Sequence, residues 1–295
     1  MHIGITGASG FLGREIVTLA RSQGHHVVGF SRKERSQVPG CQETRVFGPE
    51  MDLADIQVVV HLAGEPILGF WTKPKRERIL QSRTEGTRWV VDAVKRVPKK
   101  PEILVSASGA GIYGDRGEEI LTESSRPDTS DFLAQVAAAW EFEGQKVEAL
   151  GTRYVALRIG MVLGRDGGAL PLIGSVFRFG LGGNIGSGKQ WMPWIHVSDV
   201  AGLVLHVMEK KEIRGPLNAS GEIPIRNEEF TKALGAILKR PAFMTVPAFV
   251  LKLVAREESS LVLDSQRVVP ETALKTGYGF KYPDIESALK NLCAP

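Results

Sequence analysis

Three glycines, Gly7, Gly10 and Gly13, have the spacing in this sequence that most clearly suits a chemical task. They follow a short apolar run, His2–Thr6, and open an amphipathic segment, so the order along the chain is strand, turn and helix. Gly7 permits the turn, Gly10 lets the backbone approach a phosphate, and Gly13 lets the helix pack close to the strand. A pyrophosphate would then meet backbone N–H groups at a helix N-terminus, whereas the alternative is a tight turn with no ligand. We expect the contacts to a dinucleotide to come from Gly7, Ser9, Gly10, Phe11, Leu12 and Gly13.

The residues after the next apolar run indicate which nicotinamide cofactor fits. An NAD site normally has Asp or Glu there, about 20 residues beyond the glycine loop, to bond the ribose hydroxyls. This chain has Ser31-Arg32-Lys33 instead. A guanidinium binds a 2′-phosphate through two hydrogen bonds, and no carboxylate is present to repel it. The sequence therefore predicts NADP(H), with Ser31 and Arg32 at the 2′-phosphate; the alternative is that the two cations are only a solvated loop pair.

Alternating strand and helix patterns must position these residues. Short β-branched runs alternate with longer runs of helical period, which is typical of βαβ units that build a parallel sheet. Amphipathic helices are expected over 75–97 and 134–150. The predicted strands, each apolar enough to be covered on both faces, are His2–Thr6, His26–Phe30, Val58–Leu62, Ile103–Ser106 and Tyr154–Ile159.

The pattern changes after Gly164, where a glycine-rich stretch over 180–188 indicates a loop. Beyond it, Asn227 can cap a further helix. We therefore predict an α/β protein with a Rossmann-type doubly wound parallel sheet and a smaller C-terminal α/β lobe. The predicted domains are an NADP-binding domain over 1–163, with a return segment near 194–210, and a small substrate lobe over 164–295.

Composition argues against several classes of protein. No uninterrupted apolar run approaches the ~20 residues that a membrane span needs, and we expect neither a signal peptide nor an anchor. The two cysteines, Cys41 and Cys293, lie far apart without metal-ligand spacing, so we predict no disulfide framework, no metal site and a cytoplasmic location. The net charge of +4 comes from 37 basic and 33 acidic residues without a long basic run, so we expect no binding to nucleic acid.

The GxxGxxG spacing resembles the short-chain dehydrogenase/reductase superfamily. His61-Leu-Ala-Gly64 resembles that superfamily's cofactor-lining element, and Trp194-Ile-His-Val-Ser-Asp-Val-Ala201 resembles a motif of its extended, epimerase-like branch. The tail over 247–292 resembles the small C-terminal domain of unknown function in an atypical epimerase-family group. Other segments similar to that group, which together extend over essentially the whole chain, are Ala63-Gly-Glu65, Ser82-Arg83, Gly180-Leu-Gly-Gly183, Gly186-Ser-Gly188 with Gln190, and Ser265-Gln-Arg-Val-Val-Pro270.

The resemblance implies further properties of the site and the partners. It implies that the protein acts on a small-molecule substrate, whose identity the sequence does not give. It also implies a homodimer formed through helices that flank the sheet. Plant and cyanobacterial relatives are associated with plastid or cell division. Arg83 either contacts a cofactor phosphate or a substrate carboxylate, as the resemblance implies, or pairs with Glu85 or Glu77 on its helix. The additional cofactor contacts implied are Leu62, Ala63, Gly64, Glu65 and Arg83.

The acid–base set that is usual in the superfamily is incomplete in this chain. That set has a Ser that polarises a carbonyl, a Tyr that exchanges the proton and a Lys four residues beyond the Tyr. Phe132 stands where the Tyr belongs, and Val136 stands where the Lys belongs. Counting back from Tyr113, the serine position falls on Gly109, with Ser108 one residue away.

Ser108 and Tyr113 are therefore the candidate catalytic residues, each with a structural alternative. Ser108 either reaches a substrate or satisfies backbone groups, as buried strand-end serines commonly do. Tyr113 either acts as the acid or covers the cofactor and packs under the following loop. Two functions stay open: an NADP(H)-dependent, epimerase-like oxidoreductase whose acid is Ser108, Tyr113 or Arg83, and a non-catalytic NADPH-binding regulatory or sensor protein. The sequence does not decide whether the protein is an enzyme.

Overall fold

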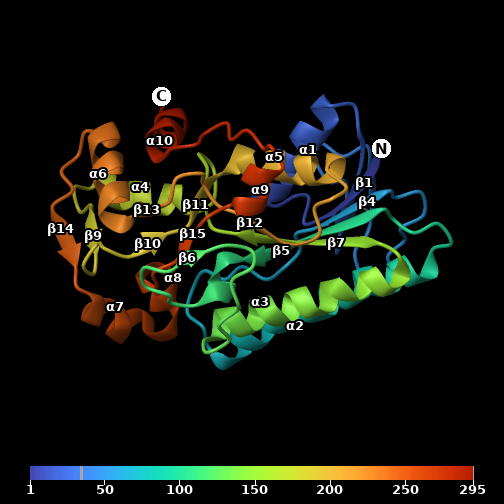
Figure 1. The fold of residues 1–295 in the computed structure, drawn as a ribbon, viewed down its shortest axis with the longest axis horizontal. Coiled ribbons are helices and arrows are strands. Elements are labelled where there is room, and N and C mark those ends of the chain that lie inside the picture. The colour runs from blue at the N-terminus through green and yellow to red at the C-terminus, as the bar shows by residue number, and fades with distance from the viewer. Residues whose placement is uncertain (34–35, 295) are drawn as a thin grey trace. The chain divides into compact units, whose positions relative to one another are not determined.

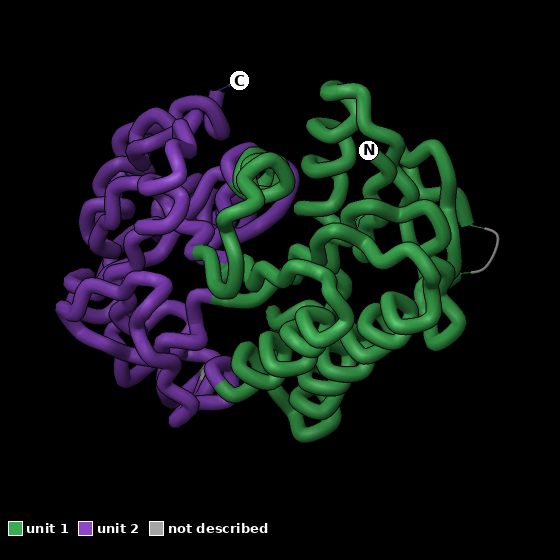
Figure 2. The backbone as a smooth tube through the Cα atoms, turned by 45° about the vertical axis from the view of Figure 1, so that its right-hand side comes forward, with its two compact units in different colours: residues 1–109, 135–158, 200–217 green, residues 110–134, 159–199, 218–295 purple. Residues whose placement is uncertain are grey.

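The computed structural model describes residues 1–33 and 36–294, which fold into two compact units (Figure 2). The first unit contains residues 1–109, 135–158 and 200–217. The second contains residues 110–134, 159–199 and 218–295, of which the last residue is not described. Both units are therefore built from segments that are distant in the sequence.

A seven-stranded sheet forms the framework of the first unit. The strand order is β12-β7-β5-β4-β1-β2-β3, and the pairs β1–β2, β2–β3, β1–β4 and β4–β5 are parallel. This order, with a crossover on each side of β1, confirms the predicted Rossmann-type doubly wound sheet. The strands are β1 (His2–Thr6), β2 (His26–Ser31), β3 (Glu43–Val46), β4 (Val58–His61), β5 (Ile103–Gly109), β7 (Arg153–Ile159) and β12 (Gly215–Ala219).

Helices cover both faces of this sheet, as βαβ crossovers require. Figure 1 draws α2 and α3 together on one face and α1 and α5 on the other. Val90, Ala93 and Val94 of α2 are buried against strand residues such as Val59 and Leu104. The helices are α1 (Phe11–Ser22), α2 (Lys73–Arg96), α3 (Phe132–Gln145), continued by a 3-10 turn over Lys146–Leu150, and α5 (Val197–Glu209).

The second unit has its own apolar core and four two-stranded sheets. Leu163, Trp194, Phe230 and Leu289 are among its buried residues. The pairs β6–β15, β8–β11 and β9–β14 are parallel, and β10–β13 is antiparallel. Its strands are β6 (Ile120–Leu121), β8 (Met161–Leu163), β9 (Gly183–Ile185), β10 (Trp191–Met192), β11 (Trp194–His196), β13 (Ile225–Arg226), β14 (Met244–Val246) and β15 (Arg267–Val268). Its helices are the 3-10 turn Ala110–Tyr113, α4 (Leu170–Arg178), α6 (Asn227–Leu238), α7 (Ala248–Ala255), the 3-10 turn Arg256–Ser259, α8 (Ser260–Leu263), α9 (Glu271–Lys275) and α10 (Ile285–Cys293).

The division between the units does not coincide with the single boundary expected at 163. Residues 110–134 belong to the second unit because β6 pairs with β15 near the C-terminus, through Ile120–Arg267 and Leu121–Val268. Residues 200–217 return to the first unit, in the region where a return segment was expected near 194–210. Strand pairing between distant segments sets this boundary, and a scan along the chain does not show such pairing.

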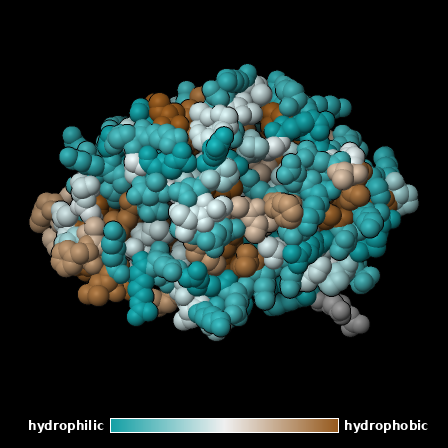
Figure 3. Space-filling model, turned by 60° about the horizontal axis from the view of Figure 1, so that its bottom comes forward, coloured by the Kyte–Doolittle hydropathy of each residue, from teal (hydrophilic) through white to brown (hydrophobic). Residues whose placement is uncertain are grey.

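The described residues contain no helix that is long and apolar enough to cross a membrane. The face drawn in Figure 3 is mainly hydrophilic, with separate hydrophobic areas. Several of the exposed apolar side chains lie in the second unit, on or near α4, β14 and α7: Leu172, Phe179, Leu181, Phe243, Phe249, Leu253 and Val254.

Candidate functional site

The glycine loop between β1 and α1 has the geometry of an anion-binding turn. Gly7 has φ +72°, a backbone conformation that favours glycine. A Cβ on Gly13 would lie 2.2 Å from the Gly7 carbonyl oxygen, whereas a Cβ on Gly10 would meet only that oxygen, at 3.1 Å. Helix α1 begins after Gly10, and no side chain caps it. Its first backbone N–H groups therefore suit a phosphate, and these residues fit the pyrophosphate of a dinucleotide.

Residues 31–33, at the end of β2, are Ser-Arg-Lys and so include two cations and no carboxylate. The Ser31 hydroxyl accepts hydrogen bonds from the Lys33 backbone N–H at 3.1 Å and from the Ser36 hydroxyl at 2.7 Å, which holds the turn. Arg32 and Lys33 are exposed, and Arg32 forms no ion pair within the described ranges 1–33 and 36–294. Its guanidinium is therefore available to an anionic group.

Thr6, at the end of β1, holds the residues that follow β4. Its hydroxyl accepts hydrogen bonds from the backbone N–H groups of Leu62 and Ala63, both at 3.2 Å, and donates one to His61 Nδ1 at 2.7 Å. The Thr87 hydroxyl donates to the Arg83 carbonyl, so it accepts from His61 Nε2 at 3.2 Å. These directions place the imidazole proton on Nε2. The chain of hydrogen bonds fixes the turn after β4 beside Gly7.

His61 is neutral at physiological pH because its ring is fully buried. Burial, with a smaller contribution from the positive charge of Arg83, lowers the pKa of His61 to about 3. A protonated imidazole here would also lose its role as acceptor from Thr6. The site thus contains a histidine that orients other groups without carrying charge.

Glu65 and Arg83 connect the turn after β4 to α2. The Glu65 carboxylate accepts a hydrogen bond from Lys75 Nζ at 2.8 Å, which holds the pKa of Glu65 below its usual range. Arg83 Nη1 donates to the carbonyls of Glu65 and Ile79, both at 3.1 Å, and its guanidinium lies 4.9 Å from the Trp140 ring centroid. Burial lowers the pKa of Arg83 to about 10, so it stays charged. Among the described residues its partners do not include Glu77 or Glu85, which removes the surface pairing considered from the sequence.

Ser108 forms a polar triad with two residues that the sequence had not joined to it. Its hydroxyl donates a hydrogen bond to Glu141 Oε1 at 2.7 Å. Arg158 donates to both oxygens of that carboxylate, from Nε and from Nη2, each at 2.9 Å. The side chain of Arg158 is 5% exposed and that of Glu141 is 15% exposed. Ser108 therefore donates to a side-chain carboxyl group, whereas the alternative considered from the sequence was a bond to backbone groups.

Tyr113 lies in the second unit and is completely buried. Its hydroxyl lies 2.7 Å from the Asn218 side-chain oxygen and 3.1 Å from the Thr122 carbonyl, and both are acceptors. Its proton is therefore already engaged inside this unit. The catalytic role of Tyr113 stays a prediction.

Helix α3 carries the positions at which the superfamily's Tyr and Lys were expected. Phe132 is its first residue and Val136 lies one turn later, so neither position supplies a proton donor. Glu141, farther along α3, is instead the side chain of this helix that contacts Ser108 and Arg158. Two sequence signals point to it: Glu141 directly follows the apolar run from Ala137 to Trp140, and Arg158 lies among apolar residues near the end of a predicted strand. Opposite charges in two buried elements predict a pair, because an unpaired buried charge is costly.

The described part of the chain contains no group of three or more His, Cys, Asp or Glu residues arranged to hold a metal ion. Cys41 is buried and Cys293 is partly buried, and both are free thiols. Burial raises the pKa of the Cys41 thiol to about 11, so it is not an activated nucleophile.

Comparison with known proteins agrees with this geometry. Residues 3–219 match the model of the NAD dependent epimerase/dehydratase family, and residues 246–292 match a domain of unknown function, DUF1731. Epimerase family protein YfhF of Bacillus subtilis is 38% identical over 302 residues, covering 100% of this chain and 98% of that protein. The chloroplastic SDR39U1 homolog of Arabidopsis thaliana is 35% identical over 300 residues, covering 98% of this chain and 86% of that protein.

A solved structure extends the similarity to three dimensions. The crystal structure of human epimerase family protein SDR39U1 (isoform 2) with NADPH has a TM-score of 0.93 to this chain. The two sequences are 33% identical, and the match covers 99% of each chain. The similarity to the epimerase-family group, first seen in short motifs, is confirmed over the whole chain.

We predict that His61 makes folding stability depend on pH. As pH falls from 6.5, the usual histidine value, toward 3, the unfolded chain binds a proton that the folded chain excludes, so stability falls. Above pH 6.5 the contribution is complete. Urea unfolding at pH 7 and pH 5 should show wild type losing about 2 kcal/mol more than His61→Asn. His2→Asn, at an exposed histidine, is the control. Equal losses in wild type and His61→Asn would contradict the neutral buried ring.

Proposed function

The chain belongs to the NAD-dependent epimerase/dehydratase family, and we propose that it is an NADP(H)-binding oxidoreductase of a small molecule. The observation that carries the proposal is the combination of an uncapped glycine loop with an exposed Arg32 at the end of β2, where the described residues 31–33 include no carboxylate. NADPH in the crystals of the similar human protein supports the same cofactor.

Each part of the dinucleotide has a matching group in the first unit. The pyrophosphate would be held by the turn from Gly7 to Gly13, including Ser9 and the N–H groups of Phe11 and Leu12. The 2′-phosphate would be held by Ser31 and Arg32, and residues 62–65 with Arg83 would line the cofactor. When bound, the nicotinamide supplies or accepts a hydride. The side chains of the protein then have to supply or accept only a proton.

We assign that proton to Ser108, with Glu141 as its acceptor. When an alcohol is oxidised, its hydroxyl proton passes to Ser108 Oγ as the Ser108 proton passes to the Glu141 carboxylate. When a carbonyl is reduced, both transfers run in reverse, so the protons balance in each direction. Arg158 holds the carboxylate in place through two hydrogen bonds.

Arg32→Ala should weaken NADPH binding much more than NADH binding. Only NADPH has the 2′-phosphate, and charge-assisted hydrogen bonds contribute about 1.5–3 kcal/mol, which corresponds to roughly 10- to 100-fold in affinity. Isothermal titration of both cofactors measures this difference. Lys33→Ala is the matched control, because it removes the neighbouring exposed cation. Equal losses of NADPH and NADH affinity in Arg32→Ala would remove the basis for NADP(H).

Ser108→Ala should lower turnover at least about 100-fold, the usual contribution of a positioned acid or base. NADPH affinity and melting temperature should stay close to wild type, because the substitution leaves the Glu141–Arg158 pair intact. Turnover is followed as NADPH oxidation with a panel of aldehydes, ketones and quinones. Ser106→Ala is the control, since Ser106 is a buried serine two residues earlier on β5. Unchanged turnover in Ser108→Ala would exclude this acid.

A second candidate function is an NADPH sensor that passes a conformational signal to a partner. It is favoured by the apolar side chains of Phe132 and Val136 where the superfamily has its acid–base pair. The same panel separates the two functions. NADPH binding with oxidation by a carbonyl compound supports the oxidoreductase, and binding without any oxidation supports the sensor.

We also propose a cytoplasmic location and a homodimer. The location rests on two cysteines that are both free thiols, as expected in a reducing compartment. The homodimer rests on the family resemblance and on helices that cover the sheet of the first unit.

A further inference from the structure

The ring of Trp191, on β10 of the second unit, is contacted by two arginines. The guanidinium carbon of Arg226 is 4.4 Å from the Trp191 ring centroid, and that of Arg267 is 4.6 Å from it. The indole N–H donates a hydrogen bond to Glu118 at 2.9 Å. The ring is thus fixed at its edge by Glu118 and contacted by two cations.

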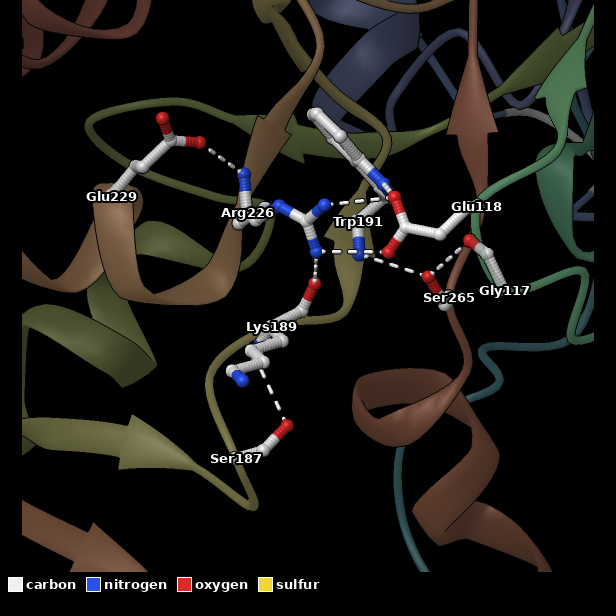
Figure 4. A network of polar contacts seen from close by, with 8 residues as sticks. All are labelled: Gly117, Glu118, Ser187, Lys189, Trp191, Arg226, Glu229 and Ser265. Atoms are coloured by element: carbon white, nitrogen blue, oxygen red, sulfur yellow. Dashed lines mark hydrogen bonds and ion pairs between the residues drawn. The ribbon is translucent and has the colours of Figure 1, made fainter.

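Both terminal nitrogens of the Arg226 guanidinium donate hydrogen bonds, as Figure 4 shows. It donates to both oxygens of Glu118, at 3.0 and 2.7 Å, and also to the Lys189 carbonyl. These contacts hold the pKa of Glu118 below its usual range, so the carboxylate is charged and neutralises Arg226. Arg226 therefore has little capacity left for a ligand.

Arg267, on β15, differs from Arg226 in its partners. Within the part of the chain that the structure describes, its guanidinium forms no hydrogen bond and no ion pair, and its Nε is buried without an acceptor. Buried donors of this kind normally have a partner. Glu118 is paired with Arg226, so among the described residues Arg267 has no carboxylate of its own to neutralise it.

The backbone around Arg267 is held firmly against β10. The Gln266 N–H donates to the Trp191 carbonyl at 3.1 Å, and the Trp191 N–H donates to the Ser265 hydroxyl at 3.1 Å. The Ser265 hydroxyl in turn donates to the Gly117 carbonyl at 2.7 Å (Figure 4). The arginine is therefore preorganised by its backbone and by the indole, which lowers the entropic cost of binding a ligand.

We propose that Arg267, stacked on Trp191, is the anchor of an anion-binding site for a carboxylate or phosphate group of a small molecule. A planar guanidinium matches both groups through two parallel hydrogen bonds. The site is built entirely within the second unit. It goes beyond the proposed redox function and does not depend on it.

The test is titration of the protein with inorganic phosphate in one arm and acetate in the other, each with and without saturating NADPH. Binding is read by calorimetry and by tryptophan fluorescence. Wild type should bind one of the two anions, and Arg267→Gln should weaken it at least about 10-fold, the loss expected for a charge-assisted pair. The arm that responds identifies the anion class. Saturating NADPH should leave anion binding at Arg267 unchanged. An anion bound in the glycine loop would instead be displaced by NADPH, so the two sites can be told apart.

Two further variants keep the test decisive. Arg267→Lys retains the positive charge but lacks the planar guanidinium, so it should bind the anion with intermediate affinity. This variant replaces Arg267→Gln in the comparison if Arg267→Gln does not fold. Arg240→Gln, at another arginine of the second unit, is the control and should bind like wild type. Equal anion affinity in wild type and both Arg267 variants, or no binding in either arm, would overturn the proposal. Failure of NADPH to bind would contradict the proposed function. It would not affect the comparison of anion affinity between wild type and the Arg267 variants.

Discussion

The Thr6 hydroxyl is the contact on which the cofactor region depends. It joins the end of β1 to the turn after β4 through Leu62 and Ala63, and it joins both to α2 through His61. The same strand end leads into Gly7, so one hydroxyl sets the spacing of the two loops that would line a dinucleotide. This arrangement requires a neutral imidazole, and burial supplies it by lowering the pKa of His61 to about 3.

The buried Glu141–Arg158 pair performs a second positioning task in the same unit. Removing both charges from water is costly, and the bidentate geometry compensates for part of that cost. The pair also gives Ser108 a side-chain acceptor, which an isolated strand-end serine would lack. The loss of the superfamily's Tyr and Lys in α3 is thus accompanied by an acid on the same helix. Our proposed function connects these two observations.

The sequence predicted the central strands well, because β1, β2, β4, β5 and β7 are apolar runs whose composition already implies burial on both faces. It did not predict the edge strands Glu43–Val46 and Gly215–Ala219, which are too polar or too rich in turn residues to show a strand pattern. The glycine loop was visible because its function depends on local backbone geometry. The Ser108–Glu141 contact was not, because it joins residues 33 positions apart.

The most direct test of the central claim is titration of the wild-type protein with NADPH and with NADH under identical conditions. The geometry of the glycine loop and the exposed Arg32 predict that both cofactors bind and that NADPH binds at least about tenfold more tightly. Equal affinities would contradict the role given to the end of β2. Absence of binding by either cofactor would contradict the assignment of the glycine loop, on which the oxidoreductase and the sensor both depend.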